Sequence, residues 1–251
     1  MDNATKRQLK KQDQFISLTD HSIDWASKNR QAAAGIAVLI VVIILGAVGG
    51  FTWYEHRSAA AATAFGAAMN TYQTPIATPG QAVPPGVKTF ATASERSKEA
   101  NAAFTSVAHQ YGMLRPGKMA EYFAGVTYME EGQNSSAEDT LKKVAGGWDE
   151  NLAALGELSL AGLYQQTGRN AQAVDIYNKL SNGKAATVPP SLAQLQLAEL
   201  YTSEGKTAEA RDIYAKLKDK DKDAKGNPGP AASIAEEKLN PKAQAPALGP
   251  Q

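Results

Sequence analysis

Apolar and polar residues follow two distinct patterns along this chain, and the first is an uninterrupted apolar run near the N-terminus. The run from Ala32 to Thr52 contains no charged residue and is dominated by Ile, Val and Leu. About 21 residues at a helical rise of 1.5 Å per residue span about 30 Å, the thickness of the hydrocarbon layer. Trp53 and Tyr54 follow, where aromatic rings prefer the lipid headgroups. The pattern predicts a transmembrane helix over residues 32–54.

A cleavable signal peptide is the main alternative, because small residues suited to cleavage follow at positions 58–62. Signal peptides, however, have apolar cores of roughly 7–15 residues behind short leaders. This run is longer, and the leader before it has 31 residues. We therefore expect the segment to be retained as an anchor.

Basic residues predict how the anchor is oriented. Only Arg57 lies within the thirty residues after the span, whereas the leader carries Lys6, Arg7, Lys10, Lys11, Lys28 and Arg30. Because basic flanks stay on the cytoplasmic side, the N-terminus is expected inside and the C-terminal part outside. We predict a single-pass protein of the bacterial inner membrane with a periplasmic C-terminal domain.

The second pattern is a motif that occurs three times. The copies are Gly125-x2-Tyr128-x3-Gly132-x4-Ala137-x3-Leu141, Ala161-x2-Tyr164-x3-Gly168-x4-Ala173-x3-Tyr177 and Ala198-x2-Tyr201-x3-Gly205-x4-Ala210-x3-Tyr214. The turn glycines are 36 and 37 residues apart, a period typical of helical-hairpin arrays. We expect the glycine to end a first helix with positive φ and the alanine to let the second helix approach closely. Expected N-caps of the second helices are Ser135 or Ser136, Asn170 and Thr207. The predicted fold class is all-α, a transmembrane helix followed by a hairpin solenoid.

The motif resembles the tetratricopeptide repeat over residues 117–218, with its small residue, tyrosine, turn glycine, second small residue and aromatic. It departs from that pattern where Glu121, Glu157 and Gln194 replace the large aromatic that usually opens each repeat. The resemblance implies that the first helices line a concave groove that holds a protein partner. The implied groove residues are Met119, Tyr122, Val126, Met129, Leu155, Leu158, Gln165, Leu192, Leu195 and Glu199. This apolar, Met-containing face suits an apolar helix or unfolded segment, unless flanking helices such as 230–239 cover it.

The order of parts also resembles the ancillary subunit family of the Sec translocon. The similarity lies in the polar leader with Trp25 before the span, the Ala-rich stretch after it and the three repeats. It implies a role in protein export, with the translocon, a periplasmic chaperone or exported chains as partners. A structural scaffold for outer-membrane biogenesis or cell division is the alternative. Gly46 and Gly50 leave open a homodimer through close packing of two anchors.

The predicted parts of the chain follow from these patterns and from a Pro/Gly-rich stretch at 74–92. They are a leader at 1–31, the span at 32–54, a stalk helix and linker at 55–93, a repeat domain at 94–239 and a disordered tail at 240–251. Helices are expected within the repeat domain at 94–111 and 230–239 as well as in the three repeats.

Composition argues against chemistry in the exported part. Beyond the leader, 20 basic and 21 acidic residues nearly balance, so no basic surface for nucleic acid is expected. The chain has no cysteine, and its three histidines lack paired metal-ligand spacing. No nucleophile elbow or phosphate-binding loop occurs. We therefore expect no catalytic residues, no cofactor and no metal, and a protein that is not an enzyme.

Overall fold

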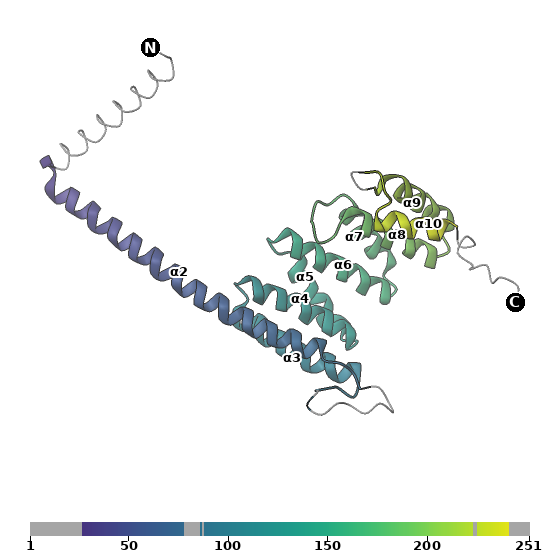
Figure 1. The fold of residues 1–251 in the computed structure, drawn as a ribbon, viewed down its shortest axis with the longest axis horizontal. Coiled ribbons are helices and arrows are strands. Elements are labelled where there is room, and N and C mark those ends of the chain that lie inside the picture. Colours follow the sequence, from purple (N-terminus) through teal and green to yellow (C-terminus); the bar gives the residue numbers. More distant parts are fainter. Residues whose placement is uncertain (1–26, 78–85, 87, 223–224, 241–251) are drawn as a thin grey trace, which may run out of the picture. The chain divides into compact units, whose positions relative to one another are not determined.

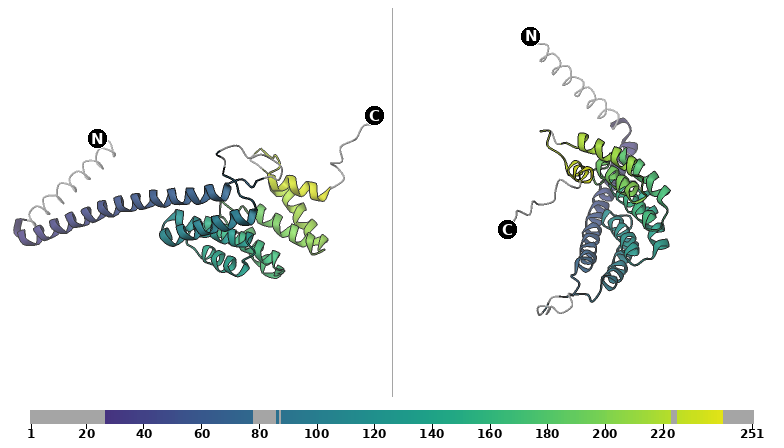
Figure 2. Two further views of the ribbon diagram at one scale, coloured as in Figure 1. Left: turned by 90° about the horizontal axis from the view of Figure 1, so that it is seen from below. Right: turned by 90° about the vertical axis from the view of Figure 1, so that its right-hand side faces the viewer.

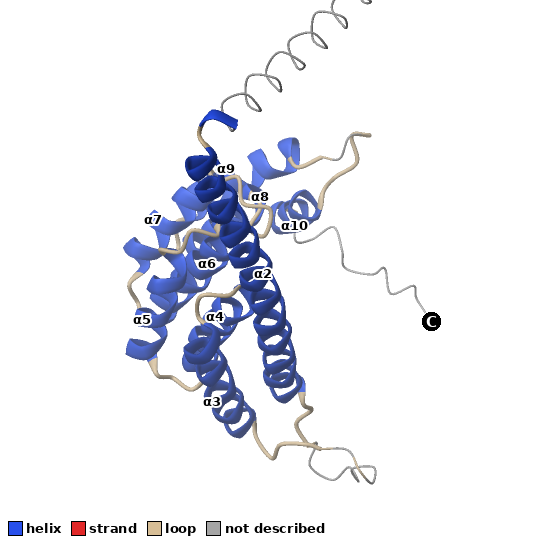
Figure 3. Cartoon of the chain, turned by 90° about the vertical axis from the view of Figure 1, so that its left-hand side faces the viewer, coloured by secondary structure: helices blue, strands red, loops and turns tan. Residues whose placement is uncertain are grey.

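The computed structural model describes residues 27–77, 86, 88–222 and 225–240 (Figure 1, Figure 3). Its helices are α2 (Arg30–Gln73), α3 (Ala93–Tyr111), α4 (Arg115–Glu130), α5 (Asn134–Ala145), α6 (Glu150–Gln166), α7 (Asn170–Ser181), α8 (Pro190–Ser203), α9 (Thr207–Lys220) and α10 (Pro230–Leu239). No strand occurs among these residues, only two isolated β-bridges. The predicted all-α class is therefore confirmed. The chain divides into two units, Met1–Ala59 and Ala60–Gln251.

In the first unit, α2 exposes apolar side chains on every side. Val38 and Leu45 are 63% and 66% exposed, and the mean hydropathy of the helix reaches 2.8 over 18 residues. A surface helix of a soluble domain would carry a polar face. This part of α2 has the length and composition of a membrane span or signal anchor. Most of the predicted leader, and residues 241–251 of the predicted tail, lie outside the described residues.

The glycines proposed for dimerisation lie within this apolar part of α2. A Cβ atom at Gly46 or Gly50 would meet no atom within 4 Å, so the surface beside both glycines is open within the chain. The homodimer itself stays a prediction.

In the second unit, the three motif copies form the hairpins α4–α5, α6–α7 and α8–α9, which follow one another in chain order (Figure 2). The turn glycines Gly132, Gly168 and Gly205 have φ of +73°, +72° and +75°, the left-handed conformation that the sequence predicts. The residue after each glycine donates its N–H to the carbonyl of the motif tyrosine, at 2.9, 2.7 and 2.9 Å. This bond satisfies a carbonyl that the end of the first helix would otherwise leave unpaired.

The second helices begin directly after these turns, and the predicted N-caps are wrong. The observed N-cap residues are Gln133, Arg169 and Lys206, one residue or more before the expected ones, and none makes a side-chain cap hydrogen bond. The reason is the tight glycine turn. It places the N-cap directly after the glycine, at a Gln, Arg or Lys, and these are not the short polar side chains that accept from the first N–H groups of a helix.

The small and bulky motif positions are buried between the hairpins. Ala137 and Ala173 have no exposed surface and Ala210 has 2%, so the two helices of each hairpin approach closely. Leu141 and Tyr177, one turn later, are also buried and join a continuous core with α6 and α8. Each helix from α3 to α10 contacts the next helix in the chain, as in a repeat array.

A further hairpin precedes the first motif copy and alters the predicted domain boundary. The segment 60–73 of α2, expected to be a stalk, packs against α3 and α4 through Phe65 and Tyr72. Their rings lie 6.0 Å from Phe104, and Phe104 stacks on Phe123 at 5.2 Å. The repeat unit thus begins near residue 60, before the predicted start at 94.

This segment of α2 runs in the same direction as α4. Phe65 packs against Phe123, and the Tyr72 hydroxyl donates to Glu130 at 2.6 Å, so contacting residues are 58 apart at both places. Since the offset is constant, the two helices are parallel, as the first helices of consecutive repeats are. The segment is therefore the first helix of an additional hairpin, with α3 as its second helix.

At the other end, α10 packs on α9 and, less extensively, on α8. Ala231 and Ala235 pack with Leu195, Tyr214 and Leu217. The helix thus occupies the place where the first helix of another repeat would lie, and it covers an apolar end of the array that water would otherwise reach.

Candidate partner-binding site

The ten predicted groove residues lie on one side of the first helices α4, α6 and α8, and we call this surface the first-helix face. None of them is fully exposed: nine are half-buried and one, Leu195, is buried. Each of these side chains is therefore partly or fully packed within the chain, and only the remaining exposed part of the face is accessible to a partner.

At the α8 end, the chain covers its own face. Leu195 is 6% exposed and packs in the cluster formed with α9 and α10. This is the covering that the sequence analysis left open for residues 230–239. Leu192 packs instead beside Ala185 and Val188 of the loop between α7 and α8. These contacts leave Leu195 unavailable to a partner while α10 is in place.

At the α4 end, aromatic and polar contacts hold the face in place. The ring of Tyr122 meets Phe123 edge-on at 5.2 Å, and the hydroxyl of Ser159 donates to the Tyr122 oxygen at 3.3 Å. Tyr122 and Met129 also pack against the core shared by α4, α5 and α6. At this end, therefore, packing within the chain and an internal hydrogen bond already hold the side chains of the face in place.

Between these ends, the middle of α6 carries an open position that the sequence analysis missed. Gly162 lies one helical turn from Leu158 and from Gln165, and a Cβ atom there would meet nothing within 4 Å. A glycine in a helix interior costs about 0.5–1 kcal/mol relative to alanine, so packing within the chain does not account for it. Gly162 could have been found from the sequence, because its helical spacing places it on the same face as Leu155, Leu158 and Gln165.

Polar groups next to the open position are held by the chain. The hydroxyl of Tyr177 donates to the Gln165 amide oxygen at 3.3 Å, and burial raises the pKa of Tyr177, with the Glu199 carboxylate adding to the shift. Glu199 accepts from the Gln196 amide at 3.4 Å. Gln165 and Glu199 therefore have partners, whereas Gln166 at the end of α6 is exposed.

A charged network ties hairpin α4–α5 to hairpin α6–α7. The carboxylate of Glu138 lies 2.7 Å from both Lys142 and Arg169, and it accepts from the Tyr164 hydroxyl at 3.1 Å. The Arg169 guanidinium also stacks on Tyr164 at 4.3 Å. Hydrogen bonds from Lys142 and Arg169 lower the pKa of Glu138 from 4.5 to about 2. A similar cation, Lys206, stacks on Tyr201 at 5.3 Å, so a cation after the turn glycine recurs in two repeats.

We expect Glu138→Gln to weaken the fold at neutral pH and not in strong acid. Because its folded pKa is depressed, Glu138 stabilises the fold above pH 4.5, and this contribution is lost as the pH falls towards about 2. Solvent screens a partly exposed pair, so we expect a cost of about 1 kcal/mol at neutral pH. Urea unfolding of the full chain in detergent, at neutral pH and near pH 2, measures both values.

The matched control is Asp212→Asn, which removes an exposed ion pair with Lys216 within one helix. Its expected cost is below about 0.5 kcal/mol. An equal loss for Glu138→Gln at both pH values would contradict the role assigned to the network.

The structure shows no metal centre in its described part: no group of three His, Asp or Glu side chains there is placed to hold an ion. The first-helix face combines apolar side chains, polar groups that have hydrogen-bond partners, and one open position at Gly162.

The comparisons with known proteins agree with this architecture. Residues 24–240 match the protein family described as the tetratricopeptide repeat-like domain. No curated protein and no solved structure matches the chain. The match covers most of the chain, including the hairpin that precedes the first motif copy. The chain therefore belongs to the tetratricopeptide repeat-like domain family, whose members generally mediate protein–protein interactions.

Proposed function

We propose that this chain is a membrane-anchored, non-enzymatic interaction protein that binds an apolar segment of a partner protein across α6. The observation that carries the proposal is Gly162, which leaves the α6 backbone bare between Leu158 and Gln165. A partner backbone can approach a helix closely only where no side chain intervenes. The half-buried leucines of α6 next to Gly162 offer apolar contact at a low cost in conformational entropy, because packing has already ordered their side chains.

The chemistry of the face favours an apolar segment over a charged one. Its flexible or branched apolar residues, among them Met119, Val126 and Met129, adapt to different apolar sequences. No lysine or arginine is among its ten residues, so it lacks the cations that would grip a terminal carboxylate. The partner is thus expected to present an apolar helix or an unfolded apolar stretch.

We further propose that the partner is met during protein export. The anchor and the charge of the leader support a domain on the outer side of the bacterial inner membrane. The order of parts resembles the ancillary subunit of the Sec translocon. Chains that emerge from an export channel are unfolded and expose apolar segments, and periplasmic chaperones receive them. Both are partners whose chemistry the first-helix face suits.

Site-specific photocrosslinking in intact membranes tests the proposal. A crosslinking residue replaces Leu158 or Gln166 beside Gly162, and Leu195 and Asp212 serve as a covered and an outer-surface control. We expect the first two sites to capture exported chains, a chaperone or the translocon, and the controls to capture little. Gly162→Leu should then reduce the yield at Gln166 several-fold, because its side chain fills the bare stretch.

The other outcomes are equally informative. Capture of one folded envelope protein from Gln166 would favour a structural scaffold over a role in export. Labelling confined to the chain itself would show that the face is closed, and the proposed binding across α6 would then be wrong. A yield at Gln166 that Gly162→Leu leaves unchanged would place the binding surface elsewhere.

A further inference from the structure

The loop between α5 and α6 carries the large side chain Trp148 almost fully in solvent. Trp148 is 85% exposed, and Met113 in the preceding loop between α3 and α4 is 97% exposed. Both residues lie in loops that lead from a second helix into the next first helix. An indole combines a large apolar ring with a polar N–H, and tryptophan is enriched at interfaces for this reason.

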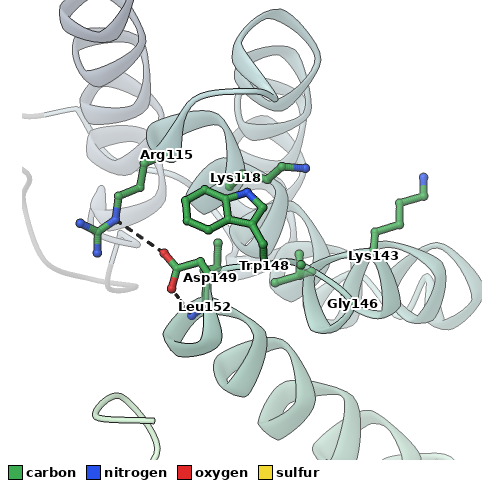
Figure 4. Close-up of a pocket in the computed structure, with 9 residues that line it drawn as sticks. Arg115, Lys118, Lys143, Gly146, Trp148, Asp149 and Leu152 are labelled. Carbon is green, nitrogen blue, oxygen red and sulfur yellow. Dashed lines mark hydrogen bonds and ion pairs between the residues drawn. The ribbon is translucent and has the colours of Figure 1, made fainter.

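The cleft beside Trp148 is basic. A hollow of about 340 Å³ is lined by this ring, by Arg115 and Lys118 of α4, and by Lys143 of α5. Figure 4 shows the indole between Arg115 on one side and Lys143 on the other, with Lys118 above the ring. The only acidic side chain in its lining is that of Asp149, whose carboxylate caps α6 and lies 3.9 Å from Arg115. Lys118 also lies 3.2 Å from Glu121, which is outside the lining. Arg115 and Lys118 therefore each have a carboxylate partner, and Lys143 leaves the cleft with a net positive charge.

The chain enters the repeat unit at this same edge. The constant offset of 58 residues between α2 and α4 places Ala60 level with Lys118, which lines the cleft. Ala60 comes six positions after Tyr54, the end of the predicted span, so Ala60 lies at most about 20 Å from that end even along an extended chain. The covalent link therefore limits how far the start of the repeat unit can lie from the end of the predicted span.

We propose that the edge formed by Trp148, Met113, Arg115, Lys118 and Lys143 contacts the bilayer, with the cations at anionic lipid headgroups and the indole in the interfacial layer. Indole rings prefer this layer because one part is apolar and the N–H needs a polar partner. Basic side chains near an anionic surface each add favourable binding that salt weakens. This contact is separate from the first-helix face and would stand even if that face bound nothing.

The test uses the full chain with Trp25→Phe and Trp53→Phe. Trp148 is then the single tryptophan left of the three in the sequence. The protein is reconstituted in nanodiscs of phosphatidylcholine, alone or mixed with phosphatidylglycerol. We expect the Trp148 emission to shift to shorter wavelength in the anionic discs and to be quenched by lipids with brominated acyl chains. High salt, or Lys118→Gln combined with Lys143→Gln, should reverse both changes.

The matched control moves the tryptophan to the opposite end of the helices. The control chain carries Trp25→Phe, Trp53→Phe and Trp148→Phe together with Gln133→Trp. Its single indole then follows the turn glycine Gly132, in an exposed position. We expect no quenching there. Equal quenching at both sites would show non-specific adsorption, and no quenching of Trp148 in either lipid would overturn the proposal. A shift to shorter wavelength without lipid quenching would assign the edge to a protein contact instead.

Discussion

Phe104→Ala is expected to lower the free energy of unfolding of the N-terminal hairpin by about 3–5 kcal/mol. Phe104 has no exposed surface, and its ring contacts Phe65 and Tyr72 of α2 and Phe123 of α4. Truncation leaves a cavity among three helices and removes the aromatic contacts that hold segment 60–73 in the repeat unit. Hydrogen exchange of the full chain in detergent measures the loss, helix by helix.

The position of the effect matters as much as its size. In a repeat array, stability is close to a sum of units and nearest-neighbour contacts, so exchange should rise in α3, α4 and segment 60–73 and change little in α8 and α9. The matched control is Leu217→Ala, a buried residue of the last hairpin, which should show the reverse pattern. Unchanged exchange in segment 60–73 of Phe104→Ala would mean that this segment is not part of the hairpin.

This additional hairpin also shows where reading the sequence reaches its limit. The three motif hairpins could be predicted because each contains a glycine with positive φ between helices of regular length. The first hairpin has no such turn: its helices are joined by residues 74–92, and its first helix shares α2 with the apolar run. Local patterns cannot distinguish a stalk from a packed helix when the residues that it packs against lie about 30–60 positions later.

The binding face illustrates the same limit at the level of single residues. The ten residues selected by helical spacing lie in the first helices α4, α6 and α8, because side chains three and four apart share a face. That they form a partner-binding groove stays a prediction. Whether a residue is open depends on what covers it. Leu195 is covered by α10, some 36 residues further on, whereas Gly162 is open and carries no side chain to attract notice. Trp148 lies in a loop, where no periodic pattern applies.

Two glycines of α6 should respond in opposite ways to the same substitution. Gly156→Ala is expected to destabilise the protein by about 1–3 kcal/mol, whereas Gly162→Ala should stabilise it by about 0.5–1 kcal/mol. A Cβ at Gly156 would lie 2.9 Å from a Val144 methyl and 3.0 Å from the backbone nitrogen of Ala145, so α5 and α6 would have to separate. At Gly162 the new methyl would meet nothing within 4 Å, and only the gain in helix propensity remains.

Urea unfolding of the two full-length variants in detergent measures both signs, and each glycine is the control for the other because both lie inside the same helix. Stabilisation by Gly156→Ala would contradict the close contact between α5 and α6. Destabilisation by Gly162→Ala would show that the chain itself closes over α6. If Gly162→Ala stabilises the fold and also reduces crosslinking at Gln166, then the bare stretch costs stability and serves binding, which is the trade-off expected of a functional position.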